Sequence, residues 1–123
     1  MQEQKIYISN RGNLAGKDPD EENKPDYIEK ALGHGVCVKT DIWVIKDRTV
    51  TGTEHPSTGI NLNIFDKEKL LIQARNPTAL LYLLEEGYHC FWRESDNLIM
   101  TNRNFILSYA GSIFPKSIIM LPE

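Results

Sequence analysis

The stretch LLIQARNPTALLYLLEEGYHCFW, residues 70–92, carries the pattern that decides the fold. Its first residues are an apolar, strand-like run that leads into a helix signal, in which Asn76 is a favourable N-cap and Pro77 suits the first helical position. Gly87 ends this helix, and HCFW resembles the next strand. The predicted buried stripe of the helix consists of Leu80, Leu81, Leu83 and Leu84. The segment therefore predicts a strand, a helix and a second strand, which is typical of a sheet with parallel pairing.

Two further strand signals lie upstream of this unit. VCVKTDIWVI (36–45) places Lys39 and Asp41 between large apolar residues, which is unusual for a strand that is buried on both faces. The other apolar run is IYI (6–8), which ends in the polar stretch SNRG (9–12). Between the two runs, DYIEKALGHG has the pattern of a helix capped by Asp26. This opening again indicates alternating strands and helices.

The remaining segments indicate loops and short strands. Residues 13–25 have the polar composition of a long surface loop, and INLNIF (60–65) is a short strand or an extended segment. TVTGT and the last third of the chain supply more short strands, separated by polar turns. No internal repeat is visible, so we expect one α/β domain over residues 1–123 with a β-rich C-terminal third.

The composition excludes several classes of function. The chain has 123 residues, of which 41% are hydrophobic and 25% charged, as in an ordinary folded domain. Its net charge of -3 and its scattered basic residues give no positive patch for non-specific nucleic-acid binding. The sequence also has no signal-peptide pattern and no apolar run of membrane-spanning length, so we expect a cytoplasmic protein. Cys37 and Cys90 are expected to be buried free thiols.

Polar residues stand at four strand ends or strand interiors. In open α/β sheets, ligands bind outside the carboxyl ends of the strands, so residues at such ends are candidates for one site. The candidates are Asn10, Arg11, Lys39, Asp41, Gly52, Thr53, Arg75 and Asn76. We expect them to converge.

Four motifs follow one another along the chain: NRGN (10–13), EENKPDYIEKAL (21–32), VKTDIW (38–43) and TGTEHP (51–56). Their order resembles the pattern of glycerophosphodiester phosphodiesterases, which have HRG, EN, ExD and GHD with a following Pro. Residues 70–92 and SIIMLPE near the end are similar to short, single-domain members of this group. A full TIM barrel needs about 250 residues. The resemblance therefore implies a reduced or distorted TIM-barrel-like α/β domain with few helices.

The resemblance also implies a metal-assisted attack on a phosphodiester, with histidines for proton transfer and carboxylates for Mg²⁺ or Ca²⁺. In this chain Asn10 and Thr53 stand at the two histidine positions, and Lys39 stands at a metal-binding glutamate. Glu22 and Asp41 match the remaining acidic positions. Asn and Thr do not exchange protons near neutral pH, and a lysine disfavours a divalent cation. These positions therefore predict no catalytic residue, no metal and no cofactor.

Positive charge is retained at two further positions of the family pattern. Arg11 matches the family, and Arg75 stands in place of a family lysine. Such a site suits a phosphate directly, with Lys39 in place of the metal and Arg75 as a bidentate fork. We therefore expect a pseudoenzyme that sequesters or senses a phosphorylated small molecule, with a nucleotide-type signal as one option. Trp92 is the candidate for stacking on a ring of that ligand.

Other interpretations stay open. Arg11 and Lys39 would also be explained as structural partners of Asp41 or Glu22, and the two polar replacements as fillers of vacated space.

Two other functions also fit the pattern. A working phosphodiesterase would use Glu22, Asp41 and His55 with Mg²⁺ or Ca²⁺. An interaction or scaffold domain would keep the fold without any ligand. In every case the uncovered flanks of a reduced barrel favour a homo-oligomer.

Overall fold

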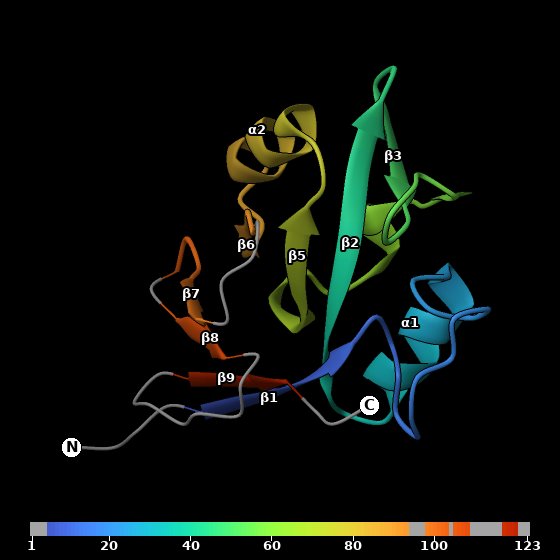
Figure 1. The fold of residues 1–123 in the computed structure, drawn as a ribbon, viewed down its shortest axis with the longest axis vertical. Coiled ribbons are helices and arrows are strands. Elements are labelled where there is room, and N and C mark those ends of the chain that lie inside the picture. Colours follow the sequence, from blue (N-terminus) through green and yellow to red (C-terminus); the bar gives the residue numbers. More distant parts are fainter. Residues whose placement is uncertain (1–4, 94–97, 104, 109–116, 121–123) are drawn as a thin grey trace.

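The computed structural model describes residues 5–93, 98–103, 105–108 and 117–120, which form one mixed sheet with helices packed against it (Figure 1). In chain order the elements are β1 (Lys5–Asn10), α1 (Pro25–Gly33), β2 (Cys37–Ile45), β3 (Arg48–Thr51), β4 (Thr58–Gly59), the 3-10 turns η1 (Leu62–Ile64) and η2 (Lys67–Lys69), β5 (Leu70–Ala74), α2 (Pro77–Glu85), β6 (Cys90–Phe91), β7 (Leu98–Met100), β8 (Ile106–Ser108) and β9 (Ser117–Met120).

β2 is the central strand of the sheet. It pairs in parallel with β1 and β5 and antiparallel with β3, and β5 pairs in parallel with β6. β4 pairs antiparallel with β3 at one edge, and from β1 the sheet extends through β9 and β8 to β7. The register places Asn10 beside Lys39 and Asp41 beside Gln73, so these four side chains belong to one face of the sheet.

The two helices cover the opposite face. α1 contributes Ile28 and Ala31 to the main core, and α2 contributes Ala79 and Leu83. The strands contribute alternate residues, among them Val38, Ile42 and Val44 of β2. On the face that carries Lys39, a smaller cluster consists of Ile8, Leu71 and Phe91. Lys39 and Asp41 therefore lie on the face of the sheet that the helices do not cover.

The prediction of a TIM-barrel-like α/β domain is wrong. Within the described residues the sheet stays open, mixes parallel with antiparallel pairs and carries two α-helices, so strands dominate. The cause lies after β2, where a barrel needs a helix. There Lys46 and Asp47 take left-handed conformations with φ of 50° and 64°, and this tight turn sends the chain back as the antiparallel strand β3.

The predicted start of α2 is confirmed. The Asn76 side chain accepts a hydrogen bond from the Ala79 backbone N–H at 2.9 Å, and proline occupies the first turn. The predicted leucine stripe is only half right, because Leu81 is 62% exposed and Leu84 is 46% exposed. The fully buried residues of α2 are Leu83, which belongs to the predicted stripe, and Ala79, which lies one turn earlier on the same side of the helix.

Smaller predictions also need correction. α1 begins at Pro25 with Lys24 as its N-cap, so Asp26 lies inside the first turn and does not cap the helix. The expected strand at residues 60–65 contains the single turn η1. Both cysteines are free, with Cys90 buried and Cys37 partly exposed. Of the strands predicted for HCFWRE, NLIMTN, FILSYAG and SIIMLPE, residues 94, 97, 109–111 and 121–123 lie outside the described residues.

Helices of a length and apolar character sufficient to cross a bilayer do not occur in the described part of the chain.

Candidate functional site

Asp41 lies at the centre of a buried ionic network. Its side chain is fully buried, and each of its two oxygens accepts hydrogen bonds. Oδ1 accepts from Lys39 Nζ at 2.7 Å and from Arg75 Nε at 2.9 Å. Oδ2 accepts from Arg11 Nε at 2.9 Å and from Asn23 Nδ2 at 3.0 Å. One carboxylate therefore holds three cationic side chains in fixed positions.

A sharp turn after β1 brings Arg11 to this carboxylate. Arg11 has a φ of 58°, and its backbone N–H donates to the Lys39 carbonyl at 2.6 Å. Gly12 follows with a φ of 90°, and a Cβ there would lie 2.9 Å from the Tyr27 ring. The turn thus needs glycine for both its conformation and its close approach to α1.

The other two cations come from β2 and from the end of β5. Lys39 and Asp41 are two residues apart on β2, so their side chains share one face. Arg75 directly follows β5, and its backbone N–H donates to the Ile42 carbonyl at 2.9 Å. The parallel pairing of β2 with β5 therefore sets the position of Arg75 over Asp41.

Asn23 connects the loop before α1 to the same carboxylate. Its side chain is buried, its Oδ1 accepts from Thr40 Oγ1 at 2.7 Å, and its Nδ2 also lies 3.3 Å from Thr53 Oγ1. Its backbone N–H donates to the Arg11 carbonyl at 3.0 Å. Asn23 therefore ties together three segments that surround Asp41.

Glu22 supplies the second carboxylate of the network. Glu22 Oε1 lies 3.7 Å from Arg11 NH1, and Oε2 accepts a hydrogen bond from Asn13 Nδ2 at 2.9 Å. We call the set Arg11, Glu22, Asn23, Lys39, Asp41 and Arg75 the Asp41 cluster. With three cations and two carboxylates it carries a net charge of +1.

The cations around Asp41 keep its carboxylate ionised at neutral pH. Burial by itself would raise the pKa of Asp41, but Lys39, Arg75 and Arg11 hold that pKa well below its ordinary value. Burial lowers the pKa of Lys39 to about 8, against the opposing effect of Asp41. Near pH 7 the cluster therefore keeps its excess positive charge.

Solvent reaches the cluster from the arginine side. The Arg75 side chain is 24% exposed and that of Arg11 is 16% exposed, whereas the Lys39 side chain is 1% exposed. An anion approaching from solvent would meet the two guanidinium groups first, with the Lys39 ammonium behind them.

The structure brings together most of the residues predicted from the sequence. Arg11, Glu22, Lys39, Asp41 and Arg75 all belong to the cluster. Thr53 borders it through Asn23, and Asn10 is buried next to Lys39 in the register of β1 with β2.

Two other candidates lie apart from the cluster. Trp92 follows β6 and is 41% exposed, and the contacts of the described residues do not join it to Asp41. His55 is an exposed residue of the loop between β3 and β4.

Sequence reasoning missed Asn23 and Gln73. Asn23 stands next to Glu22 in the EEN motif, so the motif itself was the available signal. Gln73 is 4% exposed and lies beside Asp41 in the register of β2 with β5. Its signal was a single amide within the apolar run LLIQA, which is as unusual there as Lys39 is in β2.

The donor set of the cluster does not suit Mg²⁺ or Ca²⁺. These ions need several oxygen ligands, and both oxygens of Asp41 already accept hydrogen bonds from cationic side chains. Lys39 Nζ lies 2.7 Å from Oδ1, so a divalent ion bound there would meet an ammonium at close range. Across the described ranges, groups of three or more His, Cys, Asp or Glu side chains arranged as metal ligands do not occur.

Comparison of the chain with family models, with curated proteins and with solved structures gives no match in any of the three. The resemblance to glycerophosphodiester phosphodiesterases therefore depends on the quoted motifs alone and stays a prediction.

Proposed function

We propose that the chain binds a phosphorylated small molecule at the Asp41 cluster without hydrolysing it, and so sequesters or senses that molecule. The observation that carries this proposal is the convergence of Arg11, Lys39 and Arg75 on one buried carboxylate. Within the cluster itself, three cations share two carboxylates, which leaves a net charge of +1 among its described members. A phosphate would accept hydrogen bonds from the two guanidinium groups that solvent reaches.

The roles of the side chains follow from their exposure and shape. Arg75 is the cation that solvent reaches most, and its planar guanidinium matches the oxygens of a phosphate. Lys39 adds a point charge on the buried side of the two guanidinium groups. Asp41 positions all three cations, so it supports binding without touching the ligand itself.

The same geometry gives little support for hydrolysis. A general base needs a pKa near the working pH and access to the substrate. The pKa of Asp41 lies far below that range, and Lys39, whose pKa is about 8, has a side chain only 1% exposed with its Nζ bonded to Asp41. Asn10 and Thr53 cannot exchange protons near neutral pH, and His55 lies in an exposed loop. We therefore propose binding without turnover.

Thermal-shift measurements test the binding. The probes are inorganic phosphate, glycerol 3-phosphate, AMP and cyclic AMP, and the variants are Arg75→Ala and Lys30→Ala. Lys30 is an exposed residue of α1, so its removal changes the charge equally without touching the cluster. We expect at least one probe to raise the Tm of the natural chain and of Lys30→Ala, but not of Arg75→Ala. If no probe raises Tm, or if Arg75→Ala responds like the natural chain, the scaffold hypothesis is the better one.

A turnover assay tests the second part of the proposal. With bis(4-nitrophenyl) phosphate and added Mg²⁺ or Ca²⁺, we expect no metal-dependent release of nitrophenol. Release that Asp41→Asn abolishes would show an active phosphodiesterase and overturn the non-hydrolysing assignment.

A further inference from the structure

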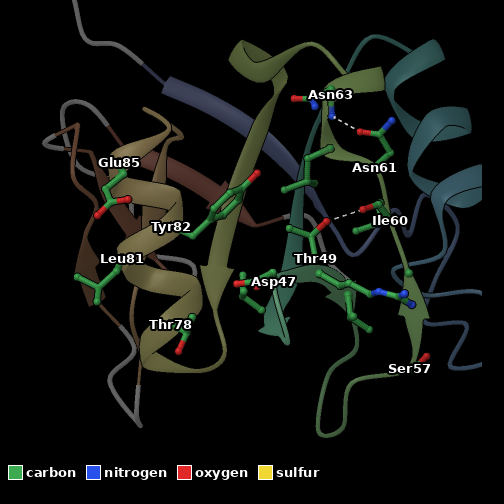
Figure 2. Close-up of a pocket in the computed structure, with 15 residues that line it drawn as sticks. Asp47, Thr49, Ser57, Ile60, Asn61, Asn63, Thr78, Leu81, Tyr82 and Glu85 are labelled. Carbon is green, nitrogen blue, oxygen red and sulfur yellow. Dashed lines mark hydrogen bonds between the residues drawn. The ribbon is translucent and has the colours of Figure 1, made fainter.

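A pocket of about 950 Å³ opens between α2 and the wall formed by β3, β4 and η1 (Figure 2). It lies on the helix-covered face of the sheet, where Val44 of β2 forms part of its lining. Asp41 belongs to the other face of the same strand. The pocket and the Asp41 cluster are therefore separate sites.

One stripe of α2 forms a side of this pocket. Thr78, Leu81, Tyr82 and Glu85 follow the spacing of a single helix face, and all four line the cavity. Figure 2 shows Tyr82 reaching from α2 toward the opposite wall, while Leu81 lies on the outer side of the helix. Leu81 therefore departs from the predicted buried stripe: it lies at the outer margin of the pocket lining, where its side chain is 62% exposed.

The opposite wall combines apolar and hydrogen-bonding groups. Its apolar part consists of Val50, Ile60 and Leu62, and its polar part of Thr49, Ser57, Asn61 and Asn63. Thr49 Oγ1 donates to the Ile60 carbonyl at 2.5 Å, and Asn61 Oδ1 accepts from the Asn63 backbone N–H at 3.1 Å. These bonds hold the wall in one arrangement before any ligand arrives.

The charges of the lining disfavour a second phosphate site. Asp47 and Glu85 contribute two carboxylates, and Arg48 contributes one guanidinium. The lining is thus net negative, opposite in sign to the Asp41 cluster. An anionic ligand would be repelled, whereas an uncharged ligand would not.

We propose that this pocket binds an uncharged sugar, a mono- or disaccharide. Pockets of about 300–1,000 Å³ with an apolar base and a few polar groups are typical of small-molecule sites. A sugar ring presents C–H groups on one face, which suit Tyr82 and the valines, and hydroxyl groups at its edge, which both donate and accept. Amides, hydroxyls and carboxylates in the lining offer both kinds of partner.

A variant that fills the pocket gives the sharpest test. Gly59 lines the pocket, its backbone needs no left-handed conformation, and a Cβ there would meet nothing within 4 Å. Gly59→Leu therefore adds a side chain without displacing the fold. Gly33→Leu is the matched control, because Gly33 has equally open surroundings and lies at the end of α1. Asn63→Ala removes one exposed amide from the rim.

The readout is the shift of backbone and side-chain amide signals in ¹H–¹⁵N NMR spectra. The probes are glucose, galactose, N-acetylglucosamine and maltose at up to about 10 mM, which saturates a site with a Kd of about 1 mM. We expect at least one sugar to shift signals of Thr49, Asn61, Asn63 and Tyr82. Gly59→Leu should weaken binding at least tenfold and Asn63→Ala severalfold, with no change in Gly33→Leu.

Several outcomes would overturn the sugar site. They are the absence of any shift, shifts that Gly59→Leu leaves unchanged, and shifts of the same signals by inorganic phosphate. A change of oligomeric state in Gly59→Leu without sugar binding would likewise overturn it, in favour of a second copy in the groove. None of these results bears on the Asp41 cluster, whose signals and ligands are different.

Discussion

Asp41 organises the charged side chains around it, although in the proposed binding its own carboxylate does not contact the ligand. Its carboxylate receives Arg11, Lys39 and Arg75 in a fully buried position, where each charge would be costly alone. The three cations therefore depend on Asp41 for their stability, and Asp41 depends on them to remain ionised. At the scale of the residue, folding and the proposed binding rest on the same contacts.

Replacing Asp41 should be far more harmful than replacing Lys39. Asp41→Asn leaves three cations without a buried counter-charge, which should lower the free energy of unfolding by about 3–5 kcal/mol. Lys39→Met keeps the volume and leaves Asp41 with two arginines, so its cost should be about 1 kcal/mol or less. Urea unfolding of both variants checks the order. Equal losses would mean that Asp41 is not the centre of the network.

The pKa of Lys39 predicts a change of stability with pH. The folded value of about 8 lies below the ordinary 10.5, so between these two values the folded chain binds fewer protons than the unfolded chain. The free energy of unfolding should therefore rise by roughly 1–3 kcal/mol from pH 8 to pH 10.5, with no such contribution below pH 8. The thiols of Cys37, which is partly exposed, and of Cys90, which is buried, act in the opposite direction, because desolvation raises the pKa of each.

Subtracting the pH profile of Lys39→Met from that of the natural chain isolates the lysine. The difference should rise with pH across this window, and a flat difference would contradict the assigned burial of the ammonium. Over the same window phosphate binding should weaken, because the cluster loses the proton that gives it its excess charge.

At the scale of the element, α2 connects the Asp41 cluster with the pocket between α2 and β3. Asn76 caps the helix through Ala79 and also pairs with Val44 of β2, since its Nδ2 donates to the Val44 carbonyl at 3.1 Å. Arg75 of the Asp41 cluster immediately precedes this cap, and the stripe that begins at Thr78 bounds the pocket. The sequence predicted the cap, because capping is local. It did not predict the exposed side of the helix, because that depends on packing partners distant in the chain.

Removal of the Asn76 cap should therefore lower the free energy of unfolding by more than removal of an ordinary helix cap does. Asn76→Ala loses the bond to Ala79 and the bonds to Val44, for which we expect a loss of about 2–3 kcal/mol in the free energy of unfolding. Asn61→Ala, which removes the cap of the single turn η1, is the control and should cost about 1 kcal/mol or less. Chemical denaturation measures both. A similar cost for the two variants would show that the link to β2 contributes nothing.

At the scale of the whole molecule, the sequence predicted two of the parallel pairs but not the final architecture. The pairs of β1 with β2 and of β5 with β6 agree with the predicted strand–helix–strand units, whereas the pair of β2 with β5 was not predicted. The prediction of a reduced or distorted TIM-barrel-like domain was wrong because the turn at Lys46 and Asp47 replaces a helix with the antiparallel strand β3. The pairing of β9 with β1, which spans almost the full length of the chain, was not predicted either. Such distant pairings leave no local signal.

β9 should be important for the integrity of the whole sheet. It pairs in parallel with both β1 and β8, and in the sheet order it separates them. Deleting residues 117–123 should therefore lower the stability and weaken hydrogen-exchange protection in β1 (Lys5–Asn10) and β8 (Ile106–Ser108). Protection in β5 should change much less. Unaltered protection in β1 would contradict the observed strand order.

The central claim is that the excess positive charge of the Asp41 cluster holds a phosphate, and isothermal titration calorimetry with inorganic phosphate tests it most directly. The natural chain and Lys30→Ala should bind phosphate saturably and with equal affinity. Arg75→Ala should bind at least about tenfold more weakly, a loss of about 1.4 kcal/mol or more. Equal binding by all three proteins, or no binding by the natural chain, would contradict the claim.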